Sequence, residues 1–336
     1  MRVLHAPAEI AGQTSILARA LREIGVEAHS LAYNATFAEY MIDEHPLYDT
    51  FSPPIRYAGY VSSLLRHAGK WDVFHFHFGR TLIPPHNPDL PLYHALGRKV
   101  VHHYHGCDVR NRAHMLATHA RSTCTDCKPF CLPKRQKRIL AEATRHVDAE
   151  IVSTPDLLES APNAQQIHVA AWLADYPWTP AREIPKLVLH APTNRLIKGT
   201  RHIEAAFERL RPRYPSVEFR IVEKLDWREL QRAMGECDIF VDQTNMGWYG
   251  MVSVEAMAMG RPALAWIRED FESRLQDCPL VRSSEATLTD DIAALLEDAP
   301  RRRALAESGR AYVEREHDAH IIARRLVELY RSIGAS

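Results

Sequence analysis

The chain has 336 residues, a length that predicts about two domains of the usual ~150 residues, each with enough apolar content for its own core. It carries 42 basic and 42 acidic residues and a formal charge of zero, which argues against a nucleic acid or a strongly anionic membrane as partner and favours a small-molecule ligand. No run approaches the ~18 apolar residues of a membrane span, and the first residues lack a signal-peptide core. We therefore expect a cytoplasmic protein whose six cysteines are reduced thiols or metal ligands.

The first half of the chain alternates short apolar runs with stretches of helical periodicity. The opening run at 3–6 leads through a turn at Gly12 into a helix whose apolar residues keep helical spacing until Gly25 ends it. Because helix-length segments separate the runs that follow, we expect parallel strands with right-handed crossovers in a doubly wound sheet. The further strands predicted for this half are 26–33, 72–79, 99–106 and 149–154.

The same alternation starts again after a linker with proline and tryptophan at 174–186. The pattern therefore predicts an α/β protein of two doubly wound, Rossmann-like domains, the first at 1–175 and the second at 183–316. An amphipathic, arginine-rich helix at 317–336, with Asp318 as its cap, ends the chain. The strands predicted for the second domain are 186–192, 217–223, 238–243 and 262–267.

Two cations follow the first strand of the second domain. Ligands of open parallel sheets bind at the carboxyl ends of the strands, beside helix N-termini that can hold anions. In LHAPTNRLIKGT, residues 189–200, a strand is followed by a loop with Arg195 and Lys198 and then by a helix. This spacing is typical of a diphosphate clamp, in which arginine offers paired donors and lysine a point charge. Two solvated surface cations are the alternative.

A carboxylate lies among apolar residues in GWYGMVSVEAMAMGRPALAW, residues 247–266. Gly250 lets the backbone approach a ligand, Met251 and Val252 present free N–H groups at a helix start, and Glu255 is placed within the first turn. A carboxylate there can accept hydrogen bonds from two neighbouring hydroxyls, such as a ribose diol. The alternative is a glutamate that favours the positive end of a helix, an effect of roughly 0.3–1 kcal/mol.

The pattern G-x-x-x-x-E-A-M-A-x-G-x-P at 250–262, preceded by K-G at 198–199, resembles the retaining nucleotide-sugar glycosyltransferases of family four. The resemblance covers nearly the whole chain, because HFHFG, HGCDVR, DAEIVSTPDLL and HAPTNRLIKGT occur in the order of that family. It implies the GT-B fold, in which two Rossmann-like domains face each other across a cleft. It also implies that the first domain binds the acceptor, the second binds the donor, and the final helix crosses back to the first domain.

The resemblance assigns roles to residues of the second domain. It implies that Arg195 and Lys198 hold the donor diphosphate and that Glu255 contacts the donor ribose. The family has a further glutamate eight residues before Glu255, where this chain has Gly247, so another group has to contact the donor sugar. The usual family arginine is also absent, because Thr193 stands at its position, and Arg195 replaces it through a shifted loop. The candidates for the missing sugar contact are Asp242, Gln243 and backbone N–H groups near Trp248 and Tyr249.

The resemblance also assigns roles in the first domain. The family places a histidine after a strand, close to the donor sugar, and His105 in HHYHGCD matches it. His105 is therefore expected to act in catalysis together with Lys198 and Glu255, and a buried core histidine is the alternative. Gly12, in the first strand-to-helix loop, joins the expected donor-binding residues. The expected acceptor-side residues are His75, His77, Arg80 and Asp108.

Three cysteines lie close together in RSTCTDCKPFCLPKR, and their C-x-x-C-x-x-x-C spacing suits a structural, tetrahedral zinc site. An iron–sulfur cluster and unliganded thiols in a loop are the alternatives. The expected zinc ligands are Cys124, Cys127 and Cys131, with Cys107, His119 or His114 as the fourth.

The sequence as a whole predicts a retaining glycosyltransferase of hexosyltransferase type, which moves a sugar from a nucleotide diphosphate sugar to a hydroxyl of a small molecule or glycan. Catalysis is expected to need no cofactor or divalent metal, because the cation pair can neutralise the leaving group and no D-x-D motif follows a candidate strand. Two alternatives stay open, a GT-B sugar-nucleotide epimerase or hydrolase and a non-catalytic sugar-nucleotide-binding subunit. The donor base and sugar, the acceptor, a peripheral membrane contact and the oligomeric state are left open as well.

Overall fold

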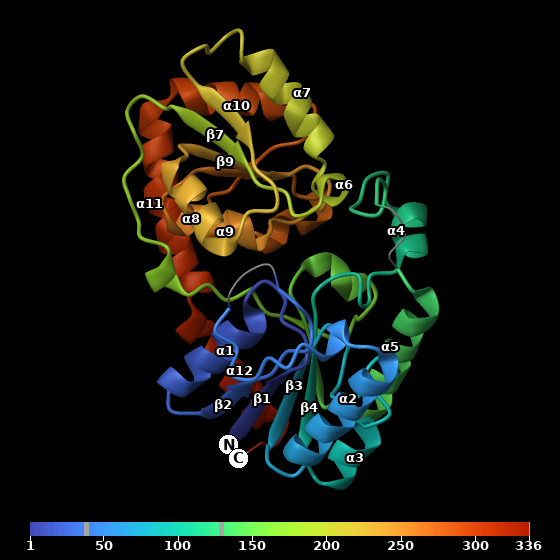
Figure 1. The fold of residues 1–336 in the computed structure, drawn as a ribbon. Helices are drawn as coiled ribbons and strands as arrows, with labels where there is room; N and C mark the ends of the chain where they lie inside the picture. Colours follow the sequence, from blue (N-terminus) through green and yellow to red (C-terminus); the bar gives the residue numbers. More distant parts are fainter. Residues whose placement is uncertain (37–39, 128–130, 336) are drawn as a thin grey trace. The chain divides into compact units, whose positions relative to one another are not determined.

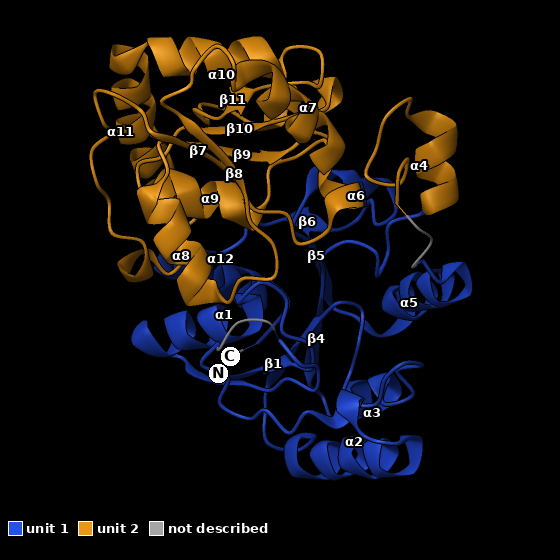
Figure 2. Cartoon of the chain, turned by 45° about the horizontal axis from the view of Figure 1, so that its top comes forward, with its two compact units in different colours: residues 1–111, 130–170, 319–336 blue, residues 112–129, 171–318 orange. Residues whose placement is uncertain are grey.

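A computed structural model describes residues 1–36, 40–127 and 131–335. The chain forms two compact units, shown in two colours in Figure 2. The first unit holds residues 1–111, 130–170 and 319–336, and the second holds 112–129 and 171–318. The expected first domain at 1–175 needs correction in two places, because residues 112–129 and 171–175 belong to the second unit. The last helix of the chain is part of the first unit.

The first unit is built on a six-stranded parallel sheet. Its strands are β1 (Arg2–Ala6), β2 (Glu27–Ser30), β3 (Val73–His77), β4 (Lys99–Tyr104), β5 (Ala149–Val152) and β6 (Gln165–Gln166). They lie in the order β2-β1-β3-β4-β5-β6. In the parallel register His5 pairs with His75 and His77 pairs with His103, so these side chains point to the same face of the sheet.

Helices cover both faces of this sheet (Figure 1). They are α1 (Gln13–Glu23), α2 (Pro53–His67), α3 (Leu90–Ala95), α5 (Pro133–His146) and α12 (Ala319–Ser332). Helices α2 and α3 pack through Tyr60 and Tyr93 on the face that carries Phe74. Helix α12 lies beside α1 and packs on the opposite face, where the Tyr330 hydroxyl lies 2.6 Å from His75 Nδ1.

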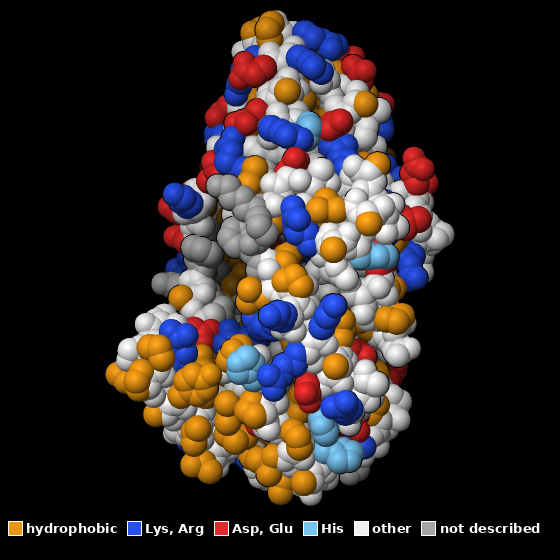
Figure 3. Space-filling view, turned by 90° about the vertical axis from the view of Figure 1, so that its right-hand side faces the viewer, with side chains coloured by type: hydrophobic (Ala, Val, Ile, Leu, Met, Phe, Trp, Pro, Cys, Tyr) orange, Lys and Arg blue, Asp and Glu red, His pale blue; other side chains and the backbone are white. Residues whose placement is uncertain are grey.

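An apolar surface remains on the outer side of α2. Ile55, Val61 and Leu65 are 58%, 45% and 80% exposed, and Figure 3 shows hydrophobic side chains gathered on this face of the first unit. Within the described residues, the helices are all too short or too polar to cross a membrane.

The second unit is built on a five-stranded parallel sheet. Its strands are β7 (Leu187–His190), β8 (Glu218–Ile221), β9 (Ile239–Gln243), β10 (Ala263–Ala265) and β11 (Val281–Arg282). They lie in the order β11-β10-β9-β7-β8, so the chain leaves β7 to one side for β8 and returns to the other side for β9. The carboxyl ends of β7 and β9 therefore form a topological switch point, where open sheets bind ligands.

The helices of the second unit also cover two faces. They are α4 (Arg112–Thr118), α6 (Arg195–Lys198), α7 (Thr200–Leu210), α8 (Trp227–Glu236), α9 (Met251–Ala258), α10 (Leu288–Glu297) and α11 (Ala299–Glu316). Helices α7 and α10 share a core with the sheet through Phe207 and Ile292. Helix α9 packs on α11, where Gly309 lies so close that a Cβ there would be 3.3 Å from the Cβ of Met257. The predicted α/β architecture of two doubly wound units is confirmed.

Candidate functional site

Lys198 lies at the carboxyl end of β7 with only 7% of its surface exposed. The Asn194 side-chain oxygen accepts the N–H groups of Leu196 (3.0 Å) and Ile197 (3.2 Å) and so begins the single turn of α6. Gly199, at φ +69°, ends that turn in the left-handed conformation that glycine tolerates best. The short helix therefore holds Lys198 directly over the switch point.

Asp242, near the end of β9, neutralises this buried cation. One carboxylate oxygen lies 2.5 Å from Lys198 Nζ, and the other accepts the N–H of Gly250 and the hydroxyl of Ser253, both at 2.7 Å. A Cβ on Gly250 would lie 2.9 Å from Lys198 Nζ, so the start of α9 approaches the lysine closely because residue 250 has no side chain. Met251 and Val252 begin α9 and are half-buried. A cation, a carboxylate and a helix N-terminus thus meet at one point.

Glu255 lies one turn further along α9, in the second turn of the helix rather than in the first turn predicted. Its Oε1 accepts a hydrogen bond from the Tyr176 hydroxyl (2.8 Å), and Trp227 Nε1 donates to the same hydroxyl (3.3 Å). Burial raises the pKa of Glu255 to about 7, although the bond from Tyr176 and the charge of Lys198 act in the opposite direction. The helix-end explanation does not fit a buried side chain in the second turn, where the carboxylate contacts Tyr176. Contact of Glu255 with a donor ribose stays a prediction.

Arg195 does not join this cluster. Its side chain is 41% exposed and forms ion pairs with Glu223 (2.8 Å) and Glu204 on the surface of the second unit. The predicted pair of cations is therefore divided, with one buried and one on the surface. The direction of the Arg195 side chain depends on two glutamates distant in sequence, which the spacing to Lys198 cannot reveal.

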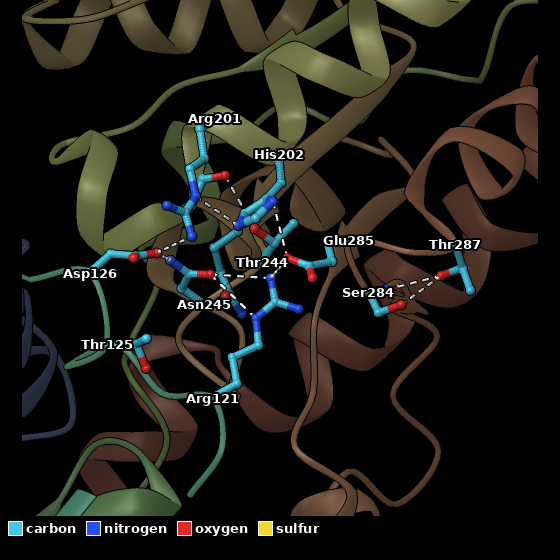
Figure 4. A network of polar contacts seen from close by, with 12 residues as sticks. Arg121, Thr125, Asp126, Arg201, His202, Thr244, Asn245, Ser284, Glu285 and Thr287 are labelled. Carbon is cyan, nitrogen blue, oxygen red and sulfur yellow. Dashed lines mark hydrogen bonds and ion pairs between the residues drawn. The ribbon is translucent and has the colours of Figure 1, made fainter. Parts of the chain in front are cut away.

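A second polar network lies beside the first and was not predicted. It involves residues 112–127, called the arm from here on, and the segments that follow β9, β10 and β11 (Figure 4). Arg121 of the arm donates to the Asn245 side-chain oxygen (3.2 Å) and pairs with Glu285 (2.9 Å). Its guanidinium lies 5.0 Å from the ring centre of Trp266. The arm therefore covers the carboxyl ends of three strands.

Asn245 couples the arm to the loop that carries Lys198. Its side-chain nitrogen donates to Asp126 of the arm (3.0 Å) and to the Leu196 carbonyl (3.1 Å), while Asp126 also pairs with Arg201 (3.0 Å). Figure 4 shows these side chains directed toward one another. The position of Asn245 just after β9 was the only sequence signal that could have pointed to it.

The first unit carries a closed ring of hydrogen-bonded side chains, called the histidine ring from here on. From Tyr330 it runs through His75 (2.6 Å), His103 (3.2 Å), Ser153 (3.1 Å), His105 (2.9 Å), His77 (3.0 Å) and His5 (3.0 Å), and it returns to Tyr330 (3.4 Å). Burial lowers the pKa of each of the five imidazoles, to about 3 for His5 and His105, so the rings are neutral at pH 7.

This ring changes the interpretation of the predicted histidines. His105 uses both nitrogens inside the first unit, Nδ1 with Ser153 and Nε2 with His77. A direct hydrogen bond from His105 to a sugar therefore requires one of these contacts to open. His75 and His77, predicted on the acceptor side, likewise use both nitrogens within the ring.

Two other residues predicted on the acceptor side have partners in the first unit. Arg80 forms a two-point ion pair with Asp49, at 2.6 and 2.8 Å. The Asp108 carboxylate accepts the backbone N–H groups of His105 (3.1 Å) and Gly106 (2.7 Å) and so orders the loop after β4. The contacts of both residues thus lie within the first unit.

The helix start at Gly12, predicted to bind the donor, already holds a carboxyl group of the protein itself. Gly12 has φ +81°, and a Cβ there would lie 2.8 Å from Ile16 Cδ1. The buried Glu9 carboxylate accepts the N–H groups of Thr14 (3.2 Å) and Ser15 (2.9 Å) in the first turn of α1. These donors are therefore occupied by Glu9.

The cysteines of the predicted zinc site fall in different units. Cys124 and Cys127 belong to the second unit and are buried, whereas Cys107 and Cys131 belong to the first and are half-buried. Residues 128–130, between them, lie outside the described part of the chain. Among the described residues, the groups of potential ligands with atoms within 4.8 Å of one another contain no cysteine. The zinc site stays a prediction.

Comparison with known proteins identifies the fold. No family model and no curated protein matches the sequence. Among solved structures, sucrose-phosphate synthase from Thermosynechococcus elongatus is similar with a TM-score of 0.66 and 15% identity over 99% of both chains. HepE from Anabaena, in complex with UDP-glucose, has a TM-score of 0.61 and 13% identity over 99% of this chain and 100% of that one. UDP-GlcNAc 2-epimerase from Neisseria meningitidis, bound to UDP-GlcNAc, has a TM-score of 0.58 and 13% identity over the same shares. The chain has the GT-B fold.

Proposed function

We propose that the protein is a retaining glycosyltransferase that transfers a sugar from a nucleotide diphosphate sugar to a hydroxyl acceptor. The observation that carries this proposal is the buried cluster at the switch point of the second unit, where Lys198, Asp242 and the start of α9 meet beside Glu255. The similar structures with bound UDP-glucose and UDP-GlcNAc support a nucleotide-sugar ligand for this fold.

Lys198 is the group proposed to bind the diphosphate. Of its three N–H bonds, one goes to Asp242 within the described residues, which leaves two for phosphate oxygens. The N-terminus of α9 adds the positive end of a helix dipole at the same point. Together they stabilise the negative charge that develops on the diphosphate as the glycosidic bond breaks.

Asp242 acts here as a positioning residue. It holds the ammonium group and the start of α9 in one network, through contacts of 2.5 and 2.7 Å, before any ligand arrives. Such preorganisation lowers the reorganisation needed during the reaction. In a retaining reaction the acceptor hydroxyl attacks from the face that the diphosphate leaves, and the departing phosphate is then available to accept its proton.

The proposal is tested by removing the charge of Lys198. Lys198→Gln should weaken binding of UDP and other nucleoside diphosphates roughly 10- to 100-fold in calorimetry, since charge-assisted hydrogen bonds contribute about 1.5–3 kcal/mol. Lys186→Gln is the matched control, because Lys186 is an exposed lysine just before β7, at the opposite end of the strand. Equal nucleotide affinity in the two variants, with the same melting temperature, would contradict the proposal.

A second candidate function is epimerisation or hydrolysis of the sugar nucleotide. It is favoured by the similarity along the full chain to a UDP-GlcNAc 2-epimerase. Product mass spectrometry separates the candidates, because a transferase releases nucleoside diphosphate and glycosylated product only with an acceptor. An epimerase changes the donor alone, and a non-catalytic subunit binds nucleotide without turnover.

A further inference from the structure

The proposed function leaves the histidine ring without a role. A neutral imidazole has one N–H donor and one lone pair, and a hydroxyl can also donate once and accept once. In a closed ring each member can therefore donate one hydrogen bond to one neighbour and accept one from the other. This explains how five neutral imidazoles can be buried without an opposite charge beside them. The ring thus also holds one nitrogen lone pair per imidazole close to those of its neighbours.

Three of these imidazoles converge. His77, His103 and His105 each offer one ring nitrogen, and the three atoms lie within 4.8 Å of one another. The closest pair, His77 Nδ1 and His105 Nε2, is 3.0 Å apart. Ligand nitrogens about 2.0–2.1 Å from a tetrahedral zinc ion are roughly 3.4 Å apart, so small side-chain rotations bring the three atoms to coordination distance.

We propose that His77, His103 and His105 bind a divalent transition-metal ion of the Zn²⁺ type. Imidazole nitrogens favour Zn²⁺, Co²⁺, Ni²⁺ and Cu²⁺, whereas Mg²⁺ and Ca²⁺ take oxygen ligands. Three protein ligands leave one position for water or another small ligand. His105 is the one member of the triad that is half-buried, whereas His77 and His103 are buried.

Two other members of the histidine ring, His5 and Ser153, can accept hydrogen bonds from the metal-bound histidines. With lone pairs of His77 Nδ1 and His105 Nε2 directed to the ion, their protons lie on the opposite nitrogens. His77 Nε2 then donates to His5 Nδ1 (3.0 Å), and His105 Nδ1 donates to Ser153 Oγ (2.9 Å). Such outer hydrogen bonds fix the tautomer and orientation of ligand histidines. The hydrogen bond between His77 Nδ1 and His105 Nε2 is replaced by one bond from each nitrogen to the metal. His103 exchanges one of its two hydrogen bonds, to His75 or to Ser153, for its bond to the metal.

A second triad is less suited. His5, His75 and His77 also place one nitrogen each within 4.8 Å, but all three side chains are completely buried. An ion there would lack both an entry path and a free coordination position toward solvent. The triad with His105 is therefore the one assigned.

The test is metal binding by the whole protein. Protein purified without chelators should contain about one zinc ion per chain by mass spectrometry of the metal. After removal of the metal, Co²⁺ should produce visible absorption bands of nitrogen ligation without the near-ultraviolet charge-transfer band of a thiolate, and Zn²⁺ should displace it and raise the melting temperature. His103→Phe should remove this binding, and His105→Ala, at the half-buried ligand, provides a second variant if the first does not fold.

His102→Phe is the matched control. His102 is the neighbour of His103 on β4, is equally buried, and faces the other side of the sheet. Within the described residues neither of its ring nitrogens has a hydrogen-bond partner. This variant should bind Co²⁺ as the wild type does. No cobalt spectrum, a spectrum with a thiolate band alone, or unchanged cobalt binding in both His103→Phe and His105→Ala would overturn the assignment.

Discussion

At the residue scale, Glu255 should make nucleotide binding depend on pH. Its pKa is raised to about 7 by burial, and in the predicted ribose contact an ionised carboxylate accepts hydrogen bonds from both hydroxyls more strongly than a protonated carboxyl does. Nucleoside diphosphate affinity should therefore rise between about pH 6 and pH 8 in the wild type, and less so in Glu255→Gln. Calorimetry across this range measures the affinity of both proteins at each pH. Ionisation of the nucleotide phosphate affects both proteins equally, so it cancels when their affinities are compared. A 2′-deoxy nucleotide should lose the same pH-dependent part, and identical pH profiles in both proteins would contradict the role.

The same carboxyl should influence stability with the opposite sign. A pKa raised from 4.5 to about 7 means that the folded state holds the proton more tightly than the unfolded state does. Without nucleotide, the contribution of Glu255 to the free energy of unfolding should thus be higher below pH 4.5 than above pH 7. The difference is roughly 3 kcal/mol, because each pKa unit corresponds to about 1.36 kcal/mol. Denaturant unfolding should show Glu255→Gln more stable than the wild type above pH 7. If Glu255→Gln is no more stable than the wild type above pH 7, the ionised carboxylate is not destabilised by burial and the prediction is wrong.

Gly250 tests the close approach of α9 to Lys198. A Cβ at this position would lie 2.9 Å from Lys198 Nζ and 3.2 Å from Asp242 Oδ2, and φ at Gly250 is −98°, which any residue adopts. Gly250→Ala should therefore displace the ammonium group, not strain the backbone, and weaken nucleotide binding about tenfold. Gly235→Ala is the control, because its Cβ would meet only the end of the flexible Met259 side chain. Full affinity in Gly250→Ala would show that Lys198 is not the phosphate ligand.

At the scale of elements, the arm should be held by its polar contacts. Asn245 joins Arg121 and Asp126 of the arm to the Leu196 carbonyl, so Asn245→Ala removes all of these hydrogen bonds together. Amide hydrogen exchange in residues 112–127 should become faster in this variant, with little change in the sheet of the second unit. Ser284→Ala is the control, since within the described residues its hydroxyl contacts only Thr287. Equal exchange in the two variants would contradict the coupling.

At the scale of the whole molecule, the last segment of the chain should be needed to complete the first unit. Helix α12 buries Ile322, Leu326 and Tyr330 against that unit, and each such side chain contributes roughly 1.5–3 kcal/mol. Removing residues 319–336 therefore takes away much of the usual 5–15 kcal/mol of a folded unit. Limited proteolysis should degrade the first unit in this truncated protein and spare the second. Tyr330→Phe, which keeps the ring packing and removes only the hydroxyl, should leave both units resistant; a resistant first unit in the truncated protein would contradict the prediction.

The amino-acid sequence determined the features that depend on neighbours along the chain. Alternating apolar runs and helical stretches predicted both doubly wound sheets, because strand and helix periodicity are local properties. Lys198 and Glu255 could be located since each lies a few residues beyond a strand or a glycine turn, where parallel sheets expose their ligand-binding ends.

The tertiary structure alone decided which partner each side chain takes. Arg195 is three residues from Lys198, yet it pairs with glutamates of other elements, and residues 112–129 leave the first unit for the second. The histidine ring joins His75 to Tyr330 across 255 positions of sequence. Periodicity shows which face of an element a side chain occupies, but a hydrogen-bond partner is chosen by packing between elements that are far apart in the chain. For that reason the two sheets and the buried lysine were visible in the sequence, whereas the arm, the Asp242 contact and the histidine ring came only from the folded molecule.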